Sequence, residues 1–298
     1  MKILLLVDPL PSAIFVQGLA HIQGSELLPY HRDLTDADLA DVEVVLAWNV
    51  PEGVCARLPR LRWVCSVAAG VEKLLTSDLP AHVPVSRIVD VEQSEGIAQF
   101  VVMMALRHAR SLPRYEVQQQ QRQWVRHPVA AVRSRVSVLG MGTMGSAIAR
   151  LLNAVGFEVT PWRRRSELSL EAVLSQSDIV VCALPLTPQT QGILNAQALA
   201  LLPRGAYLIN VARGGHVVEA DLIASVRSQH LTGAALDVQR REPMPADDPL
   251  WSVPGITITP HIGAQSSVQT IAAQFAEGLE ALQNGSVLPR LVDRTAGY

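Results

Sequence analysis

Short runs rich in Val, Ile and Leu alternate with longer helix-like stretches along the whole chain. This alternation is typical of parallel sheets covered by helices on both faces, because the crossover between parallel strands is usually a helix. The expected strands form a first series at 2–7, 43–47, 62–67 and 85–89, and a second at 135–139, 157–161, 178–183, 206–211, 233–238 and 256–259. The first series predicts a small α/β unit, and the second series predicts a doubly wound parallel sheet of Rossmann type.

Composition excludes several classes of protein. The 298 residues suffice for about two domains, and 25 basic against 27 acidic residues leave a net charge of −2. Nucleic acid and anionic membrane are therefore unlikely as partners in electrostatic terms, and no apolar run approaches the ~20 residues of a membrane span. The apolar part of residues 1–10 is too short for a signal peptide. We expect a cytoplasmic α/β protein.

Arginine is the dominant basic residue, because Lys2 and Lys73 are the only lysines. A planar guanidinium binds carboxylate or phosphate through two parallel hydrogen bonds, so individual arginines are candidates for local anion recognition. The three cysteines lie in apolar stretches without C-x-x-C spacing or nearby histidines. We interpret them as buried thiols and expect no metal site.

Three further segments connect or extend the two series. Residues 94–110 have helical apolar periodicity, with a serine and a glutamate at the start. Residues 111–126 are polar and contain an isolated Trp124, which fits either a solvated helix or loop, or an arm that packs on another subunit and reaches its site. Residues 264–283 are helix-like, and we expect them to return to the first unit, making that domain discontinuous.

A glycine-rich loop identifies the expected cofactor class. Gly140, Gly142 and Gly145 form G-x-G-x-x-G directly after a strand and before an amphipathic run. Such glycines allow a tight turn, close approach of the backbone to a pyrophosphate, and close packing of helix on strand. Thr143 and Met144 would donate backbone N–H groups at the helix N-terminus, where phosphate is favoured. This context predicts dinucleotide binding.

The end of the next strand distinguishes NADP(H) from NAD(H). NAD enzymes usually place a carboxylate there for the ribose 2′-hydroxyl, whereas this chain has Trp162 followed by Arg163, Arg164 and Arg165. Guanidinium groups attract a 2′-phosphate, and one of them can also stack on adenine. The pattern favours NADP(H) over NAD(H). The alternative is a solvated surface cluster.

Three residues follow later strands of the second series and complete the candidate site. They are Arg213 in NVARGG, Glu242 in REPMP and His261 in TPHIGA. Open α/β sheets bind ligands at the carboxyl ends of their strands, so we expect these three side chains at one edge of the cofactor domain.

Several motifs together resemble the D-isomer-specific 2-hydroxyacid dehydrogenase family, over essentially the whole length. Within it, the chain is most similar to the glyoxylate/hydroxypyruvate reductase A branch. The matching segments are VAAGV at 67–71, GMGTMG at 140–145, ALPLT at 183–187, NVARGG at 210–215, LDV at 236–238, REPMPADDPLW at 241–251, PHIGA at 260–264 and RTAGY at 294–298. The resemblance implies a discontinuous, flavodoxin-like substrate domain at 1–95 and 266–298 and a Rossmann domain at 96–265.

The resemblance also implies the reaction, the NADPH-dependent reduction of small 2-keto acids such as glyoxylate and hydroxypyruvate. His261 would supply the proton, Glu242 would hold the other ring nitrogen, and Arg213 would bind the substrate carboxylate and ketone oxygen. The small domain would add backbone N–H donors of Ala69, Gly70 and Val71, and its closure would assemble the site. Trp48 is either a substrate-side aromatic or a core residue.

Further cofactor contacts and assembly follow from the same resemblance. Leu184 and Pro185 would line the nicotinamide pocket, and Asp237 would accept a hydrogen bond from the carboxamide. The remaining expected cofactor contacts are Val211, Ala212, Gly263 and Ala264. The family resemblance also implies a homodimer formed through the nucleotide-binding domain.

Two alternatives remain open. One is a dehydrogenase of another D-2-hydroxy acid, phosphoglycerate or a larger one. A phosphorylated substrate would require basic residues in the small domain, where Arg57, Arg60, Arg62 and Arg87 have no motif that assigns them. A cofactor-sensing, non-catalytic scaffold is the other alternative. The joint presence of Arg213, Glu242 and His261 argues against it.

Overall fold

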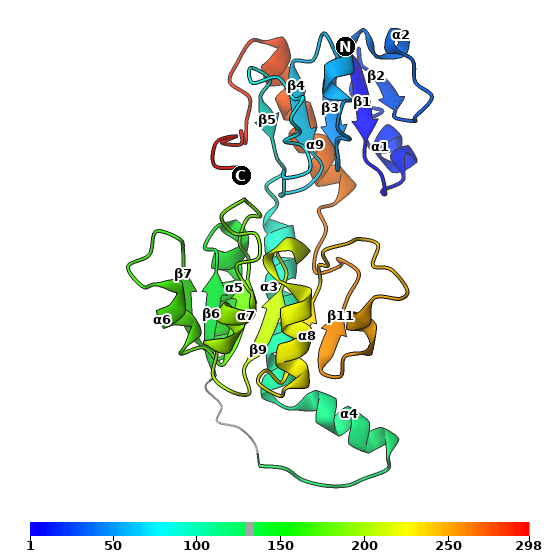
Figure 1. The fold of residues 1–298 in the computed structure, drawn as a ribbon. Coiled ribbons are helices and arrows are strands. Elements are labelled where there is room, and N and C mark those ends of the chain that lie inside the picture. The colour runs from blue at the N-terminus through cyan, green and yellow to red at the C-terminus, as the bar shows by residue number, and fades with distance from the viewer. Residues whose placement is uncertain (129–133, 298) are drawn as a thin grey trace. The chain divides into compact units, whose positions relative to one another are not determined.

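The protein is represented by a computed structural model that describes residues 1–128 and 134–297. The chain divides into two compact units, Met1–Val91 with Gln265–Tyr298, and Glu92–Ala264 (Figure 1). The sequence predicted the first boundary after residue 95, four residues later than in the structure. It predicted the second boundary after residue 265, one residue later than in the structure. None of the helices in the described part of the chain is long and apolar enough to cross a membrane.

The first unit contains a five-stranded parallel sheet in the order β2-β1-β3-β4-β5. Its elements are β1 (Lys2–Leu6), α1 (Ser12–Gly18), β2 (Glu26–Pro29), α2 (Asp36–Leu39), β3 (Val42–Ala47), the 3-10 helix η1 (Cys55–Arg57), β4 (Trp63–Ser66), β5 (Val85–Ser86) and α9 (Val268–Gln283). The returning helix α9 covers one face of this sheet, where Phe275 stacks on Trp63 with ring centroids 5.1 Å apart.

Two differences from the expected elements have simple causes in this unit. Sequence reasoning missed β2, a half-exposed edge strand that pairs only with β1 and ends at Pro29, so it lacks the apolar run of a buried strand. The strand expected at 85–89 ends at Ser86, because the N–H of Arg87 leaves the sheet and donates to the carbonyl of Arg290 in the C-terminal segment.

The second unit contains a six-stranded parallel sheet in the order β11-β10-β9-β8-β6-β7. Its elements are α3 (Val91–Ala109), α4 (Leu112–Gln120), β6 (Arg135–Leu139), α5 (Thr143–Ala154), β7 (Glu158–Trp162), α6 (Leu170–Leu174), β8 (Ile179–Cys182), α7 (Ala196–Ala200), β9 (Tyr207–Asn210), η2 (Gly214–His216), α8 (Glu219–Arg227), β10 (Gly233–Leu236), η3 (Pro249–Ser252) and β11 (Ile256–Ile258). The helix expected at 94–110 begins three residues earlier, after Asp90, a residue type that caps helices.

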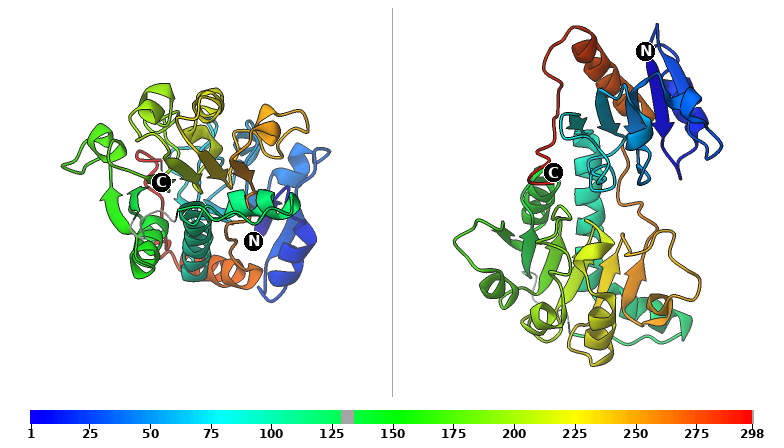
Figure 2. Two further views of the ribbon diagram at one scale, coloured as in Figure 1. Left: turned by 90° about the horizontal axis from the view of Figure 1, so that it is seen from below. Right: turned by 45° about the horizontal axis from the view of Figure 1, so that its top comes forward.

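Helices cover both faces of this second sheet, as the view along the strands shows (Figure 2). Successive residues of β8 alternate between two cores: Val180 and Cys182 pack with residues of α6, α7 and α8, whereas Ile179 and Val181 pack with residues of α3 and α5. The chain moves outward from β6 first to β7 and then, in the other direction, to β8. This reversal makes the carboxyl ends of β6 and β8 the switch point at which such sheets bind ligands.

All three cysteines are buried and free, as expected. Burial raises the pKa of the Cys65 and Cys182 thiols to about 12 and that of Cys55 to about 11. These groups therefore remain protonated thiols at neutral pH and behave as small apolar side chains.

Candidate active site

The glycine-rich loop follows β6 at the switch point. Gly140 has φ +99°, and a Cβ atom there would lie 2.5 Å from the carbonyl oxygen of Ala183, so only glycine fits without a shift. A Cβ atom on Gly145 would lie 1.7 Å from the carbonyl oxygen of Gly140, which explains the close packing of α5 on β6. In contrast, no atom outside the neighbouring backbone lies within 4 Å of a Cβ atom placed on Gly142.

This loop has the features that a pyrophosphate requires. Gly142 is the N-cap of α5 and has no side chain, so no side-chain cap is bonded to the first amide groups of the helix, at Thr143, Met144 and Gly145. Unsatisfied N–H groups and the helix dipole together attract an anion to a helix N-terminus. The residues present therefore fit a dinucleotide at this loop.

The arginine turn begins one residue after β7, directly beside the glycine loop. The N–H of Gly140 donates to the carbonyl of Trp162 at 2.9 Å, and the next residues, Arg163, Arg164 and Arg165, are all exposed. Within the described ranges none of the three forms a salt bridge, so their guanidinium groups are available to an external anion. The Trp162 side chain is 6% exposed and packs in the core of the unit.

The segment after β8 forms the other side of the switch point. Leu184 is buried at 7% exposure, and the carbonyl of Pro185 accepts a hydrogen bond from the Thr190 hydroxyl at 2.7 Å. The same carbonyl lies 3.2 Å from Nε2 of His216, a residue of the next loop. Side chains thus fix the backbone of this segment at the sheet edge.

The loop after β9 carries Arg213. Asn210, at the end of the strand, is fully buried; its amide donates to the carbonyl of Arg213 at 2.9 Å, and its oxygen accepts from the N–H of Ala212 at 3.1 Å. A Cβ atom on Gly214 would lie 1.9 Å from the backbone of Gln239, so the glycine lets this loop contact the one after β10. The Arg213 guanidinium donates to the carbonyl of Ala212 at 2.7 Å.

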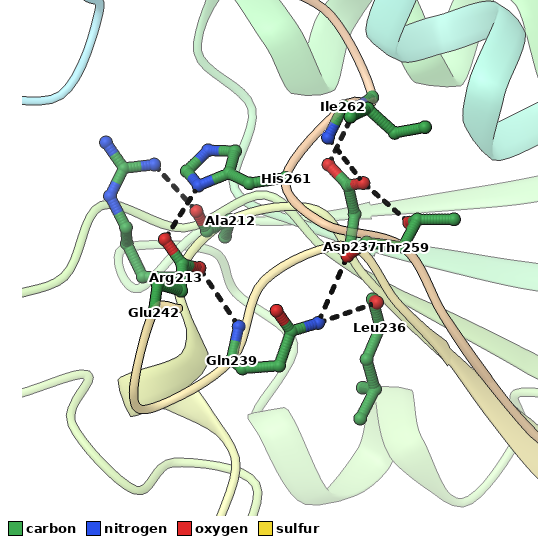
Figure 3. A network of polar contacts seen from close by, with 10 residues as sticks. Ala212, Arg213, Leu236, Asp237, Gln239, Glu242, Thr259, His261 and Ile262 are labelled. Carbon is green, nitrogen blue, oxygen red and sulfur yellow. Dashed lines mark hydrogen bonds and ion pairs between the residues drawn. The ribbon is translucent and has the colours of Figure 1, made fainter. Parts of the chain in front are cut away.

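Glu242 and His261 meet at the same edge of the sheet (Figure 3). The Nδ1 atom of His261 lies 3.0 Å from Oε2 of Glu242, and the two side chains are 26% and 25% exposed. The other carboxylate oxygen of Glu242 accepts from the backbone N–H of Gln239 at 3.1 Å. This second bond orients the carboxylate towards the imidazole. The structure therefore brings Arg213, Glu242 and His261 onto adjacent loops.

The loop that carries His261 is anchored by a buried carboxylate. Oδ1 of Asp237 accepts from the Thr259 hydroxyl at 2.6 Å and the Ile262 N–H at 2.9 Å, and Oδ2 accepts from the Gly263 N–H at 2.8 Å (Figure 3). The N–H of His261 donates to the Asp237 carbonyl at 2.8 Å, and His261 adopts φ +55°, a conformation that costs free energy for a residue with a side chain.

This role of Asp237 was missed in the sequence, where the residue was assigned only to the cofactor carboxamide. At 1% exposure, both of its oxygens already accept hydrogen bonds from the protein. A signal existed, because a charged residue at the end of a fully apolar strand must find partners, and the next loop along the sheet offers them.

The expected substrate residues of the first unit follow β3 and β4 of its own sheet. Trp48 is half-buried, and the ammonium group of Lys73 lies 5.7 Å from its ring centroid. The turn that contains Ala69, Gly70 and Val71 is shaped by Ser66, whose buried hydroxyl accepts from the N–H of Ala68 at 3.0 Å and donates to the Gly70 carbonyl at 2.9 Å. Sequence reasoning did not identify Ser66, since a lone serine at a strand end carries no motif.

Known proteins match this chain over nearly its full length. Residues 102–263 match the model of the D-isomer specific 2-hydroxyacid dehydrogenase, NAD binding domain. The glyoxylate/hydroxypyruvate reductase A of Yersinia enterocolitica is 33% identical over 285 residues, which cover 90% of this chain and 91% of that protein.

Two solved structures are also similar. A D-isomer specific 2-hydroxyacid dehydrogenase of Xanthobacter autotrophicus Py2, in complex with NADPH and MES, is 37% identical with a TM-score of 0.89, covering 100% of this chain and 99% of the other. An NADPH-dependent glyoxylate/hydroxypyruvate reductase of Sinorhizobium meliloti, in complex with NADP and sulfate, is 31% identical with a TM-score of 0.91 and the same coverage. The chain belongs to the D-isomer-specific 2-hydroxyacid dehydrogenase family.

Proposed function

We propose that this protein is an NADPH-dependent reductase of small 2-keto acids, which converts glyoxylate to glycolate and hydroxypyruvate to D-glycerate. The observation that carries the proposal is the 3.0 Å pair of His261 and Glu242 beside the Arg213 loop, at the sheet edge that also holds the glycine-rich loop. When bound, the cofactor supplies a hydride from C4 of its nicotinamide. The protein must supply a proton donor and a cation for the carboxylate.

His261 is the proposed proton donor. Glu242 engages Nδ1, and Nε2 is the nitrogen that we assign to give a proton to the oxygen that becomes the alcohol. Glu242 also keeps the ring in one orientation, because its own carboxylate is held by the Gln239 N–H. Both residues thereby act on one proton transfer, His261 directly and Glu242 through its hold on the ring.

Arg213 is the proposed substrate clamp. Its guanidinium can bind a carboxylate bidentately and polarise the adjacent carbonyl, and the carbonyl group of Arg213 itself is fixed by Asn210. From the first unit, the N–H groups of the turn 69–71 and the ring of Trp48 would complete the substrate site.

The proposed cofactor is NADP(H) in preference to NAD(H). The N-terminus of α5 would hold the pyrophosphate, and Arg163, Arg164 and Arg165, exposed and without salt bridges to described residues, would bind the 2′-phosphate. Residues of the segments after β8 to β11 would hold the nicotinamide end. The residues proposed there are Leu184, Pro185, Val211, Ala212, Asp237, Gly263 and Ala264.

A phosphorylated substrate is disfavoured by the charges of the first unit. Arg57 pairs with Asp36 at 2.6 Å, and Arg60 pairs with Asp41 at 2.7 Å. Arg62 pairs with Glu43 at 3.0 Å. Three of the four arginines considered for a phosphate are therefore already neutralised by carboxylates.

We also propose a homodimer formed through the second unit. The helix α4 and the segment after it present apolar side chains to solvent, among them Leu112, Val117 and Val125, and Trp124 is 91% exposed. Such a cluster is typical of a protein interface. Light scattering should give twice the chain mass, and Trp124→Ala should weaken the dimer or alter the kinetics; unchanged mass and kinetics would remove Trp124 from this interface.

The substrate assignment is tested with a panel of glyoxylate, hydroxypyruvate, pyruvate and 3-phosphohydroxypyruvate, each with NADPH and with NADH. We expect the highest kcat/KM for glyoxylate or hydroxypyruvate with NADPH, and D-glycerate as the chiral product of hydroxypyruvate. A preference for the phosphorylated acid, or no turnover with any member of the panel, would contradict the proposal.

The proton donor is tested with His261→Ala, with His230→Ala as the matched control. The His230 ring contacts the carbonyl of Leu199 at 3.1 Å in the same unit, away from this edge. We expect His261→Ala to lose roughly 10²–10⁴-fold in kcat with little change in the NADPH dissociation constant, and the control to retain wild-type kcat. A His261→Ala enzyme with near-normal kcat would refute the assignment.

A further inference from the structure

His216 is a fully buried histidine whose ring joins two loops of the proposed site. It closes η2, three residues after Arg213, and has 0% exposure. Its Nδ1 lies 3.0 Å from the carbonyl oxygen of Arg213, and its Nε2 lies 3.2 Å from the carbonyl oxygen of Pro185. Neither the family motifs nor the proposed chemistry accounts for this residue.

The chemistry of these contacts makes the ring the donor in each of them. Carbonyl oxygens only accept hydrogen bonds, so each contact needs an N–H on the facing ring nitrogen. A neutral imidazole has one N–H and serves one carbonyl at a time, whereas the doubly protonated ring serves both. In either state the ring lies between the carbonyls of Arg213 and Pro185 and holds them at a set separation.

The bridge is part of a continuous line of buried polar groups. On one side, Asn210 donates to the Arg213 carbonyl at 2.9 Å. On the other, the Thr190 hydroxyl donates to the Pro185 carbonyl at 2.7 Å. Both Asn210 and Thr190 are buried, at 0% and 4% exposure. The line thus runs from the end of β9 to the segment after β8, with His216 at its centre.

Backbone hydrogen bonds join the same two segments on both sides of the bridge: the Val211 N–H donates to the Cys182 carbonyl at 3.3 Å before it, and two further bonds follow it. Gly192 N–H donates to the Gly215 carbonyl at 2.8 Å, and Leu194 N–H donates to the His216 carbonyl at 2.9 Å. These bonds do not reach Pro185. The imidazole is therefore the group that joins the Arg213 carbonyl to the Pro185 carbonyl.

We propose that His216 is a positioning residue that fixes the loop of the substrate clamp, Arg213, relative to the loop of the nicotinamide pocket, at Pro185. The inference rests on the roles proposed above for Arg213 and Pro185. Hydride transfer depends steeply on the geometry between donor and acceptor, and a displacement of about 1 Å can cost 10²-fold in rate. A ring that fixes the backbone of both loops limits such displacements without contacting substrate or cofactor.

The first test measures the loops without cofactor or substrate. In His216→Phe, which places a six-membered ring there and removes both ring nitrogens, amide hydrogen exchange should accelerate in peptides covering 184–190 and 211–216. The matched control is His230→Phe, which removes one ring-to-carbonyl contact, with Leu199, in the same unit. There, faster exchange should be confined to the surroundings of Leu199. Equal exchange in 184–190 for the two variants would overturn the proposal.

The second test measures the reaction. With 4-deuterated NADPH, His216→Phe should show a kcat lowered by roughly 10- to 100-fold and a larger primary isotope effect, because misalignment makes hydride transfer limiting. The NADPH dissociation constant should change less than about threefold, because the cofactor is held mainly at its phosphates. The control His230→Phe should match the wild type in all three quantities.

A conservative variant separates positioning from folding. His216→Gln retains an amide N–H near the place of Nε2, and it should recover part of the rate and of the exchange protection at 184–190. If His216→Phe does not fold, the same question is decided by comparing His216→Gln with His230→Phe in the rate and in the exchange protection at 184–190. An isotope effect at the wild-type value in both His216 variants would overturn the positioning role. Failure of the wild type to reduce any 2-keto acid would instead overturn the proposed function, and the exchange experiment would still stand.

Discussion

Replacing Asp237 by Asn tests whether its carboxylate anchors the His261 loop. The carboxylate accepts three hydrogen bonds, from Thr259, Ile262 and Gly263, at 2.6–2.9 Å. An amide has one oxygen, so in its better orientation it keeps two of these bonds as neutral ones and turns its NH₂ group towards the Gly263 N–H.

The expected cost follows from these contacts. A hydrogen bond to a charged group contributes about 1.5–3 kcal/mol. The substitution loses one such bond and weakens the other two by about 1 kcal/mol each. Relief from burying a charge offsets part of the loss, which leaves a net destabilisation of about 3 kcal/mol. Because the Asp237 side chain holds the backbone of Ile262 and Gly263, the two residues that follow His261, we also expect kcat to fall at least about tenfold.

The assay is urea unfolding followed by fluorescence, with kcat measured on the same preparations. The control is Asp221→Asn, since Asp221 accepts a single bond from the Ala196 N–H at 2.8 Å. This substitution should lower the free energy of unfolding by less than about 1 kcal/mol. If Asp237 instead serves mainly the cofactor carboxamide, Asp237→Asn would weaken NADPH binding and leave the free energy of unfolding near that of Asp221→Asn. That result would refute the anchoring role.

Three other predictions follow from single features. Changing Arg163 and Arg164 to Ser should raise the KM for NADPH at least about tenfold and leave that for NADH nearly unchanged, because only NADPH has a 2′-phosphate; equal losses in steady-state assays would contradict it. Burial lowers the pKa of His108 to about 4, so the unfolded state binds more protons than the native state between about pH 4 and 6.5, and the free energy of unfolding should fall by up to about 3 kcal/mol as the pH falls through that window. His108→Phe should flatten this dependence in urea unfolding at several pH values, and an unchanged slope would contradict it. Arg294→Ala removes four hydrogen bonds to carbonyls of residues 79–83, at 2.6–3.1 Å, and should lower the thermal unfolding midpoint by an amount equivalent to roughly 2–4 kcal/mol, whereas a wild-type midpoint would show that the C-terminal segment does not hold this loop.

Much of the second unit was predictable from the sequence, because its four inner strands, β6, β8, β9 and β10, are mostly buried and consist of short apolar runs. The strand at 135–139 has the expected bounds, and five others differ by one or two residues at their ends. The first unit was less predictable, because β2 is a half-exposed edge strand with only one partner. Hydrophobic periodicity in the sequence reflects burial, so an element with little buried surface gives a weak signal.

The sequence by itself determined the residues at the sheet edge. Parallel strands place all their carboxyl ends at one edge, so Arg213, Glu242 and His261 were expected together once the strands were recognised, and the 3.0 Å contact of Glu242 with His261 agrees with that expectation. Only the tertiary structure decided what holds them there. The side-chain partners of Asp237 and the Pro185 partner of His216 lie 22 to 31 residues away in the chain. A hydrogen bond between such segments depends on where the sheet brings them, which no local pattern encodes.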